Sequence, residues 1–147
     1  MNYLAPISTI MTTEVITVAE RDRLSRVRDI FKENRIHHIP VTRSGKVVGM
    51  ISREDLLLFM KGLGENALEK IINETRLNNY TAEVIMTTGL GKLEPEDRIN
   101  VALDIFAKNL FRALPVVKDD RLVGIVTTYD IIKKLNEEAS APYAKEE

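Results

Sequence analysis

The sequence predicts a mixed α/β (α+β) fold built from two copies of one β-α-β-β-α unit. The main observation is internal: shifted by 75 residues, the chain matches itself without a gap, with 15 identities over positions 10–60. The segment Ile-Met-Thr-Thr at 10–13 returns at 85–88. Strand-like and helix-like patterns also alternate within each copy. Two copies are too few for a solenoid, so we expect a pseudo-twofold pair that shares one core.

Each copy is expected to start with a short strand and a helix. The strands are predicted over 15–18 and 90–93, and Asp22 and Asp97 are the expected helix N-caps. Apolar residues recur at helical spacing in the first of these helices: Leu24, Val27, Ile30 and Phe31.

Two strands joined by a polar turn come next. They are predicted over 39–42 and 46–52, and in the second copy over 114–118 and 121–127. A final helix is expected to begin near Arg53 in the first copy and near Thr128 in the second.

The copies are expected to occupy 7–60 and 82–135, with a linker over 61–81 and a flexible tail over 136–147. Gly62 and Gly64 should end the preceding helix, and residues 67–76 read as a linking helix before a turn at Asn78-Asn79. One face of that helix carries its apolar residues: Leu68, Ile71 and Ile72.

Composition excludes several classes of function. The chain has 147 residues, a net charge of −1 and interspersed charges, which argues against a general nucleic-acid binder. The absence of cysteine excludes disulfides, thiolate metal sites and cysteine nucleophiles. The longest apolar run, residues 56–60, is far too short to span a membrane, and the first residues do not form a signal peptide. We therefore expect a cytoplasmic protein.

The junction between the last strand and the last helix carries the same pattern in both copies. It reads Gly-x-x-Ser/Thr-x-x-Asp and starts at Gly49 in the first copy and at Gly124 in the second. One interpretation is a capping box, which contributes about 0.5–2 kcal/mol to a helix. The other is a ligand site, because a helix N-terminus attracts phosphate and a carboxylate can accept both hydroxyls of a ribose. Its occurrence twice, in register, favours a ligand site without excluding the cap.

Two further features are candidates for ligand contacts. His37 and His38 are the only histidines, and contact with an anion is favoured over metal binding or acid–base catalysis, because no third ligand or nucleophile accompanies them. Gly91, next to Lys92, marks either a bulge at a sheet edge or a close approach that would admit a flat ring.

The last helix of the first copy is apolar on every face over residues 56–60. A helix of this kind is buried on more than one side. Contact with a second protomer through Leu57, Phe59 and Met60 is one explanation, and extra burial under the linking helix is the other.

Together these features resemble a tandem CBS domain, the small module named after cystathionine β-synthase. The resemblance rests on Ile-Met-Thr-Thr at the start of each copy, Asp before the helix, His-His-Ile-Pro-Val at 37–41 and the terminal Gly-x-x-Ser/Thr-x-x-Asp. It implies two units packed through their sheets about a pseudo-twofold axis, two clefts between them, and dimerisation into a flat disc.

The resemblance also implies roles for individual residues. Asp55 and Asp130 would hold ribose hydroxyls, Ser52 and Thr127 would contact phosphate, and Pro40 and Pro115 would line the clefts. The first strands would receive the adenine, at Ile16, Thr17 and Val18 and at Gly91, Lys92 and Leu93. Basic residues next to the central strand, His37, His38 and Arg112, would contact the phosphates. Ala113 stands where the first copy has His38, a departure that puts strong phosphate binding in one cleft in doubt.

The function expected from the resemblance is regulatory and not catalytic. The module would bind AMP, ADP or ATP, or an adenosyl compound such as S-adenosylmethionine or methylthioadenosine, and report its occupancy to a protein partner. The alternative is a dimerisation or scaffold module whose clefts are vestigial. No metal or cofactor is expected, and neither a membrane nor a nucleic acid is an expected partner.

Overall fold

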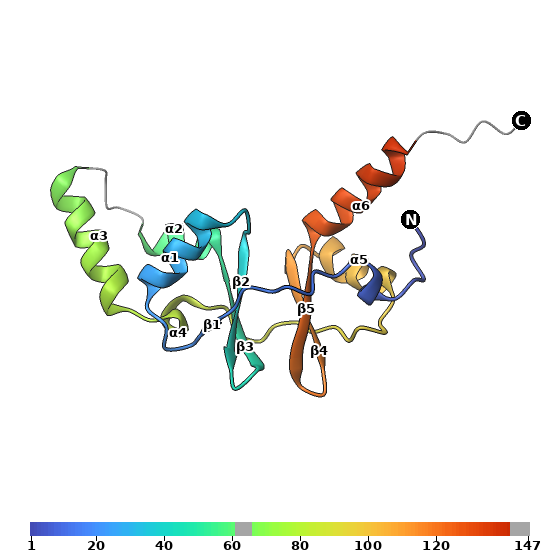
Figure 1. Cartoon of the computed structure of the whole chain (residues 1–147), viewed down its shortest axis with the longest axis horizontal. Helices are drawn as coiled ribbons and strands as arrows, with labels where there is room; N and C mark the ends of the chain where they lie inside the picture. The colour runs from blue at the N-terminus through green and yellow to red at the C-terminus, as the bar shows by residue number, and fades with distance from the viewer. Residues whose placement is uncertain (61–65, 142–147) are drawn as a thin grey trace, which may run out of the picture. The chain divides into compact units, whose positions relative to one another are not determined.

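The computed structural model describes residues 1–60 and 66–141, and Figure 1 shows the chain. The predicted mixed α/β class is confirmed. The elements in chain order are η1 (Ile7–Thr9), β1 (Val18–Ala19), α1 (Leu24–Glu33), β2 (His38–Arg43), β3 (Lys46–Ser52), α2 (Arg53–Phe59), α3 (Ala67–Asn79), α4 (Ala82–Ile85), α5 (Ile99–Ala107), β4 (Ala113–Lys118), β5 (Arg121–Thr127) and α6 (Thr128–Ser140).

Contacts divide the chain into two compact units. The first, which we call the α3 unit, comprises Val15–Leu90 with Asp120–Leu122. The second, the α6 unit, comprises Met1–Glu14, Gly91–Asp119 and the chain from Val123 onwards. Residues 1–14, which include the start of the first copy, thus belong by their contacts with the second copy, and the start of the second copy belongs with the first.

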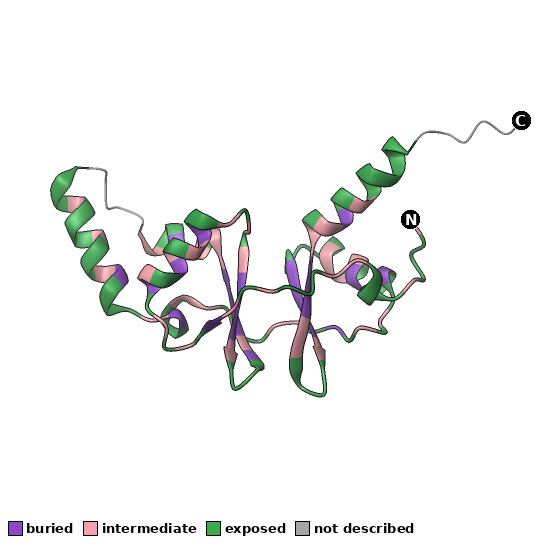
Figure 2. Ribbon diagram, in the orientation of Figure 1, coloured by how far each residue is buried: buried purple, intermediate pink, exposed green. Residues whose placement is uncertain are grey.

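The α3 unit is built on a three-stranded sheet in the order β1-β2-β3. Strand β1 is parallel to β2, and β2 is antiparallel to β3. The buried face of α1 covers this sheet through Leu24, Val27 and Phe31, the spacing predicted for that helix. Figure 2 shows the buried residues concentrated on the strands and on the helix faces turned toward them.

The α6 unit repeats this arrangement with a two-stranded sheet, β4-β5. Its core contains Ile99 and Ala102 of α5, Leu114 and Val116 of β4, and Ile7 from the start of the chain. Ile7 is completely buried, which explains why the N-terminal segment groups with this unit.

The repeated Ile-Met-Thr-Thr segments pair with the last strand of the other copy. Thr12 and Ile125 exchange two backbone hydrogen bonds of 2.9 Å, and Thr87 and Met50 exchange two of 2.8 and 3.0 Å. Thr12 and Thr87 are 75 residues apart, and so are Met50 and Ile125. The duplication therefore extends to the way in which the copies exchange their starts.

The predicted N-caps Asp22 and Asp97 are wrong. The N-cap positions are Arg23 and Arg98, and neither makes a side-chain cap. The two aspartates close the preceding loops instead: Asp22 Oδ2 accepts from the Ala19 N–H at 2.8 Å, and Asp97 Oδ2 accepts from the Glu94 N–H at 2.7 Å.

Backbone carbonyls take over the capping of these helices. The Leu24 N–H donates to the Tyr80 carbonyl at 2.9 Å, and the Ile99 N–H donates to the Ala5 carbonyl at 3.0 Å. A helix leaves its first N–H groups without partners inside the helix, and here a distant segment satisfies one of them.

The first strands are shorter than predicted. In place of 15–18 the structure has Val18–Ala19, and in place of 90–93 it has a single parallel bridge between Leu93 and Val116. The strands expected over 46–52 and 121–127 are confirmed, and the two before them begin one residue earlier than expected, at His38 and Ala113. Buried Val18 pairs with Val41, and exposed Ala19 pairs with Thr42.

The linking helix and the last helix are longer than predicted. Helix α3 continues to Asn79, so the turn expected at Asn78-Asn79 is wrong. Helix α6 continues to Ser140, so the tail does not start at residue 136. Gly62, Gly64 and residues 142–147 lie outside the described residues.

Candidate functional site

The conserved geometry of the two copies is clearest at the strand–helix junctions. In the α3 unit the Asp55 N–H donates to Ser52 Oγ at 3.0 Å, and Asp55 Oδ2 accepts from the Ser52 N–H at 2.7 Å. In the α6 unit the Asp130 N–H donates to Thr127 Oγ1 at 3.2 Å, and Asp130 Oδ2 accepts from the Thr127 N–H at 2.8 Å. Both junctions are therefore complete capping boxes.

The capping boxes leave part of each carboxylate available. The cap uses Oδ2 of both aspartates, and Thr127 Oγ1 also lies 2.9 Å from Asp130 Oδ2. Within the described chain, Oδ1 of neither aspartate accepts a hydrogen bond. Both side chains are half-buried, so each junction fixes a carboxylate whose second oxygen can still bind a donor.

The β-sheet of the α3 unit brings His38 next to this junction. His38 pairs with Ser52 in the antiparallel register of β2 and β3. Side chains of directly opposed residues lie on the same face of a sheet, about 5 Å apart at their Cβ atoms. The imidazole of His38 and the hydroxyl of Ser52 are therefore neighbours.

The other two predicted basic residues, His37 and Arg112, contact the first residues of α2 and α6 through their main chain. The carbonyl of His37 accepts from the Arg53 N–H at 2.9 Å, and the carbonyl of Arg112 accepts from the Thr128 N–H at 3.0 Å. Both side chains are exposed. The main chain at 37 and 112 thus anchors α2 and α6, and the side chains remain at the surface.

The segments expected to receive the adenine have mixed exposure. Ile16 is 37% exposed and Thr17 is half-buried, whereas Val18 is a core residue. Lys92 is exposed, and the backbone of Leu93 is occupied by hydrogen bonds to Pro115 and Val117. Val18 and Leu93 therefore serve the core, and the residues before them remain accessible.

The two prolines lie in the central strands. Pro40, in β2, and Pro115, in β4, are both buried. The role that the resemblance implies for them, lining the clefts, stays a prediction.

The glycines of the junction pattern accommodate methionine side chains. A Cβ added at Gly49 would lie 2.5 Å from Met86 Sδ, and one added at Gly124 would lie 2.8 Å from Met11 Sδ. The group that approaches each glycine closely is thus the methionine of an Ile-Met-Thr-Thr segment. At Gly91 the nearest atom is Leu114 Cδ2, at 3.2 Å.

The apolar run at 56–60 divides into buried and exposed positions. Leu56 is 5% exposed and packs in the core, whereas Leu57 and Leu58 are 62% and 63% exposed. Phe59 packs edge-on against Tyr80 and lies under the guanidinium of Arg76. The run therefore combines burial near the linking helix with an exposed apolar surface.

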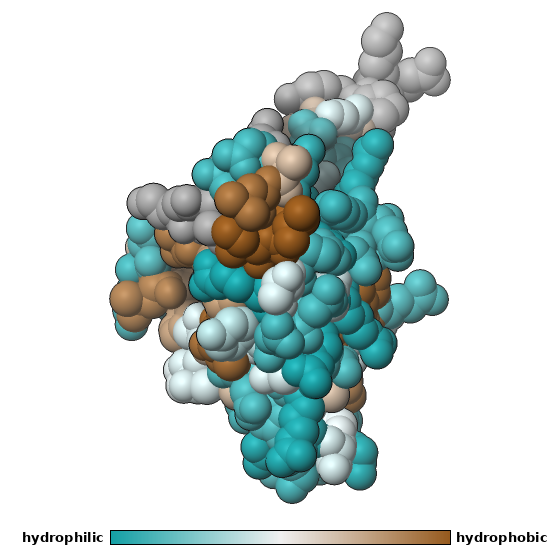
Figure 3. Space-filling model, turned by 90° about the vertical axis from the view of Figure 1, so that its left-hand side faces the viewer, coloured by the Kyte–Doolittle hydropathy of each residue, from teal (hydrophilic) through white to brown (hydrophobic). Residues whose placement is uncertain are grey.

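Helix α3 adds further apolar surface to the same unit. Figure 3 faces the end where α3 lies in Figure 1 and shows apolar side chains gathered at the surface. The exposed apolar residues of α3 are Leu68, Ile71 and Ile72.

Ion pairs in the α3 unit displace the pKa values of two glutamates. Hydrogen bonding by Arg43 lowers the pKa of Glu20, and hydrogen bonding by Arg28 lowers the pKa of Glu74. Among the described residues, no group of three acidic or histidine side chains could hold a metal ion. The described helices also include none that is both long and apolar enough to cross a bilayer.

Comparisons with known proteins identify relatives for most of the chain. The CBS domain model matches residues 7–62 and 82–137. The CBS domain-containing protein YhcV of Bacillus subtilis is 26% identical over 121 residues, which cover 82% of this chain and 79% of YhcV. The match to uncharacterized protein MJ1404 of Methanocaldococcus jannaschii is 31% identical, but the chain spans only 31% of that protein.

Solved structures agree with this assignment. The CBS domain of a CBS domain-containing membrane protein from Sphaerobacter thermophilus is 29% identical, with a TM-score of 0.77 over 89% of this chain and 88% of that one. The CBS domain pair of protein MJ0100, solved with 5′-methylthioadenosine and S-adenosyl-L-methionine, is 25% identical, with a TM-score of 0.69 over 88% and 98% of the two chains.

Some relatives are named as enzymes. The A-adding tRNA nucleotidyltransferase of Aquifex aeolicus is one, and this chain spans 14% of it. The matched part is therefore a small portion of that protein. With the family model matched twice, in register with the internal repeat, this chain belongs to the CBS domain family as a tandem pair.

Proposed function

We propose that this chain is a regulatory module that binds an adenosine nucleotide or adenosyl compound and communicates its occupancy to a protein partner. The candidates are AMP, ADP and ATP, and also S-adenosylmethionine and methylthioadenosine. Two sets of residues would bind the ligands, one centred on Ser52 and Asp55 and the other on Thr127 and Asp130. We propose a regulatory role, without catalysis, for both.

The observation that carries the proposal is the partly used carboxylate at each junction. The cap holds Oδ2 in place and orients the side chain without occupying Oδ1. A ribose presents two neighbouring hydroxyl donors, and a carboxylate oriented in advance loses little rotamer freedom when it accepts them. The capping box and the ligand site are therefore compatible interpretations of the same residues.

Phosphate binding is expected to differ between the two sets. In the α3 unit His38 lies beside Ser52, as the register of β2 and β3 shows. In the α6 unit the equivalent position is Ala113, which is buried, while exposed Lys92 lies near the start of that copy. We therefore propose that the module favours ligands with little phosphate charge, and that the Thr127 and Asp130 set binds more tightly.

A related structure supports this ligand class. The CBS domain pair of MJ0100, 25% identical to this chain, was solved with 5′-methylthioadenosine and S-adenosyl-L-methionine. Neither of those compounds carries a phosphate, which agrees with Ala113 standing where the first copy has His38.

The route to the partner is proposed to run through a homodimer. Leu57 and Ile132 occupy equivalent positions in the two copies, and they are 62% and 61% exposed. Equivalent exposed apolar residues on α2 and α6 suit a symmetric interface between two copies of the chain. A ligand that binds one arrangement of this module better than another would shift the population toward it, and a partner that recognises that arrangement would respond.

Calorimetric titration of the intact protein tests the ligand proposal. Methylthioadenosine, S-adenosylmethionine and AMP would be titrated into the wild type and into Asp55→Asn and Asp130→Asn variants. The amide oxygen can serve the cap, but an NH2 donor then replaces the free Oδ1 that would accept from the diol, so we expect about a tenfold loss of affinity with the fold intact. Asp104→Asn, on an exposed face of α5, is the control.

The scaffold alternative predicts a different result. If no adenosyl compound binds the wild type while the protein still dimerises, the clefts are vestigial and the chain acts as a scaffold. If ligands bind with the same affinity to both variants, the two aspartates serve the caps alone.

A further inference from the structure

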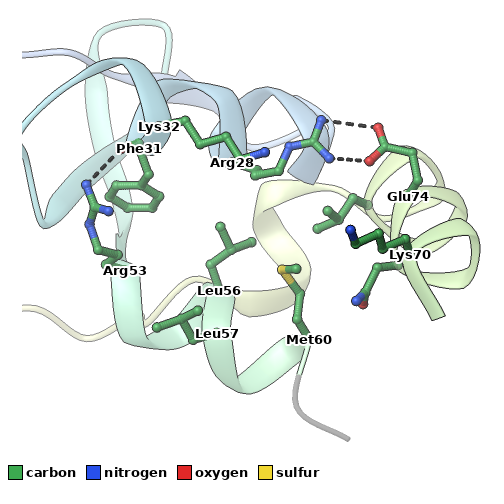
Figure 4. A pocket seen from close by; sticks show the side chains of 11 residues that line it. Arg28, Phe31, Lys32, Arg53, Leu56, Leu57, Met60, Lys70 and Glu74 are labelled. Atoms are coloured by element: carbon green, nitrogen blue, oxygen red, sulfur yellow. Dashed lines mark hydrogen bonds and ion pairs between the residues drawn. The ribbon is translucent and has the colours of Figure 1, made fainter. Parts of the chain in front are cut away.

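Helix α3 encloses a hollow that lies away from the strand–helix junctions. Figure 4 shows it between α1, α2 and α3, with a volume of about 560 Å³. Pockets for small molecules commonly have volumes of about 300–1,000 Å³. The second copy is followed by no helix equivalent to α3 among the described residues, so the hollow is a feature of the α3 unit.

The floor of the hollow is apolar. Phe31 comes from α1, Leu56 and Met60 come from the end of the first copy, and Leu77 comes from α3. Phe31, Leu56 and Leu77 are at most 5% exposed and also belong to the core of the unit. These side chains are fixed by packing, which makes the floor rigid.

Four of the eleven lining residues are cationic and one is anionic. Two of the cations are engaged. Arg28 donates to both oxygens of Glu74, and Arg53 donates to the carbonyls of Phe31, Asn34 and Ile36.

Lys32 and Lys70 differ from the two arginines. Within the described residues, neither side chain makes a hydrogen bond or an ion pair, and the charge of Lys32 also acts on Glu74. Figure 4 shows Lys70 extending from α3 toward α2, and Lys32 lies on the α1 side. Two ammonium groups thus border the apolar floor. Arg28 already binds Glu74, the one acidic residue that lines the hollow.

A buried acceptor completes the set. Asn73 lines the same hollow, and its Oδ1 is buried with no hydrogen-bond partner in the described part of the chain. A buried carbonyl oxygen without a donor is unfavourable, and such groups usually have a partner in the functional state.

We propose that this hollow binds a small apolar carboxylate that carries a hydrogen-bond donor. The apolar body would lie on Phe31, Leu56 and Leu77, the carboxylate would pair with Lys70 and Lys32, and the donor would satisfy Asn73 Oδ1. An aromatic or branched aliphatic acid with an N–H or O–H group has this combination. The site does not depend on the proposed adenosyl ligands, and it would give the module a second input.

Three related probes test each part of this recognition. Indole-3-acetate combines an aromatic body, an N–H donor and a carboxylate. Indole-3-ethanol lacks the charge, and 1-methylindole-3-acetate lacks the donor. Each would be titrated at millimolar concentration into the ¹⁵N-labelled full chain, with dissociation constants from amide chemical shifts.

We expect indole-3-acetate to shift amides of α1, α2 and α3 in a saturable manner. The two modified probes should bind about tenfold more weakly, because each loses one hydrogen-bonded or charged contact. Lys70→Gln should weaken indole-3-acetate and leave indole-3-ethanol unchanged, because only the former carries the charge that Lys70 recognises. Lys133→Gln, an exposed lysine on α6, should change neither.

Several results would overturn the proposal. One is the absence of saturable shifts at these helices, and another is equal affinity for all three probes, which would mean adsorption to apolar surface. Shifts at α2 and α3 that follow protein concentration and not probe concentration would mean that a second copy of the chain covers the hollow.

Discussion

Replacement of Gly124 by alanine tests how the duplicated copies exchange their starts. A Cβ at Gly124 would lie 2.8 Å from Met11 Sδ, 3.1 Å from Met11 Cγ and 3.0 Å from the Thr12 carbonyl oxygen. Non-bonded carbon atoms prefer separations of about 3.5–4.0 Å, so the new methyl group would overlap its neighbours by up to about 1 Å. The methionine side chain can move, but the Thr12 oxygen is held by the Ile125 N–H at 2.9 Å.

The size of the effect follows from this contact. Overpacking of a well-packed core costs about 1–3 kcal/mol, and weakening one backbone hydrogen bond adds about 1 kcal/mol. We therefore expect Gly124→Ala to lower the free energy of unfolding by about 2–4 kcal/mol. Urea unfolding followed by circular dichroism should show a midpoint lower by about 1 M or more, for a slope near 2 kcal/mol per M.

Two further variants make this test specific. Gly91→Ala should cost less than about 1 kcal/mol, because its nearest atom, Leu114 Cδ2 at 3.2 Å, is the end of a side chain and needs to shift by only a few tenths of an ångström. Met11→Ala removes two of the three close contacts, so the Gly124→Ala and Met11→Ala double variant should be less destabilised than the sum of the single variants. The reasoning fails if Gly124→Ala matches the wild type, or if the two effects are simply additive.

Three other predictions concern surface ion pairs, loops and assembly. Hydrogen bonding by Arg28 lowers the pKa of Glu74 below 4.5, so the stability that Glu74 contributes is present above that pH and is lost as the pH falls through the lowered pKa. Urea midpoints of Glu74→Gln should therefore lie below those of the wild type at pH 7 and converge with them below pH 4.5; a constant gap would contradict this. Asp97→Ala should cost about 1 kcal/mol by removing the bond to the Glu94 N–H, whereas Asp97→Asn should keep most of it; equal losses in a urea titration would point to the charge and not to the bond. Leu57→Glu and Ile132→Glu should weaken a homodimer in sedimentation velocity without changing stability by more than about 0.5 kcal/mol, and unchanged sedimentation would remove these residues from the interface.

Much of the fold could be predicted because local patterns and tertiary contacts agree. The period of α1 placed Leu24, Val27 and Phe31 on its buried face, and the polar turns marked the ends of β2, β3, β4 and β5. The capping boxes were also legible, since a hydroxyl residue followed three positions later by an acid satisfies the first N–H groups of a helix.

The sequence-based predictions were wrong where contacts with distant segments replace local interactions. Asp22 looked like an N-cap, but the carbonyl of Tyr80 already accepts from the Leu24 N–H, so the carboxylate was free to close a loop. No local pattern reveals that partner, because it lies more than fifty residues away in the sequence.

The candidate site was only partly predictable from the sequence. The register of β2 and β3 places His38 beside Ser52, as alternation along the strands would suggest. The hollow under α3 had no signature in the sequence, because its lining comes from three helices and because Asn73 and Lys70 look like ordinary residues of an exposed helix. The methionine contact at Gly124 was hidden in the same way, since it depends on the exchanged start of the chain.

The most direct test of the central claim is the thermal unfolding midpoint of the purified protein with millimolar adenosine compounds. The panel would contain AMP, ADP, ATP, S-adenosylmethionine and methylthioadenosine, with GTP as the control for the base. A ligand present at about 100 times its dissociation constant adds about 2.7 kcal/mol, or roughly 5–10 °C for a chain of this size. The account predicts such a shift for at least one adenosine compound, its absence with GTP, and its loss when Asp55 and Asp130 are both replaced by Asn. An unchanged midpoint with every adenosine compound would contradict the account.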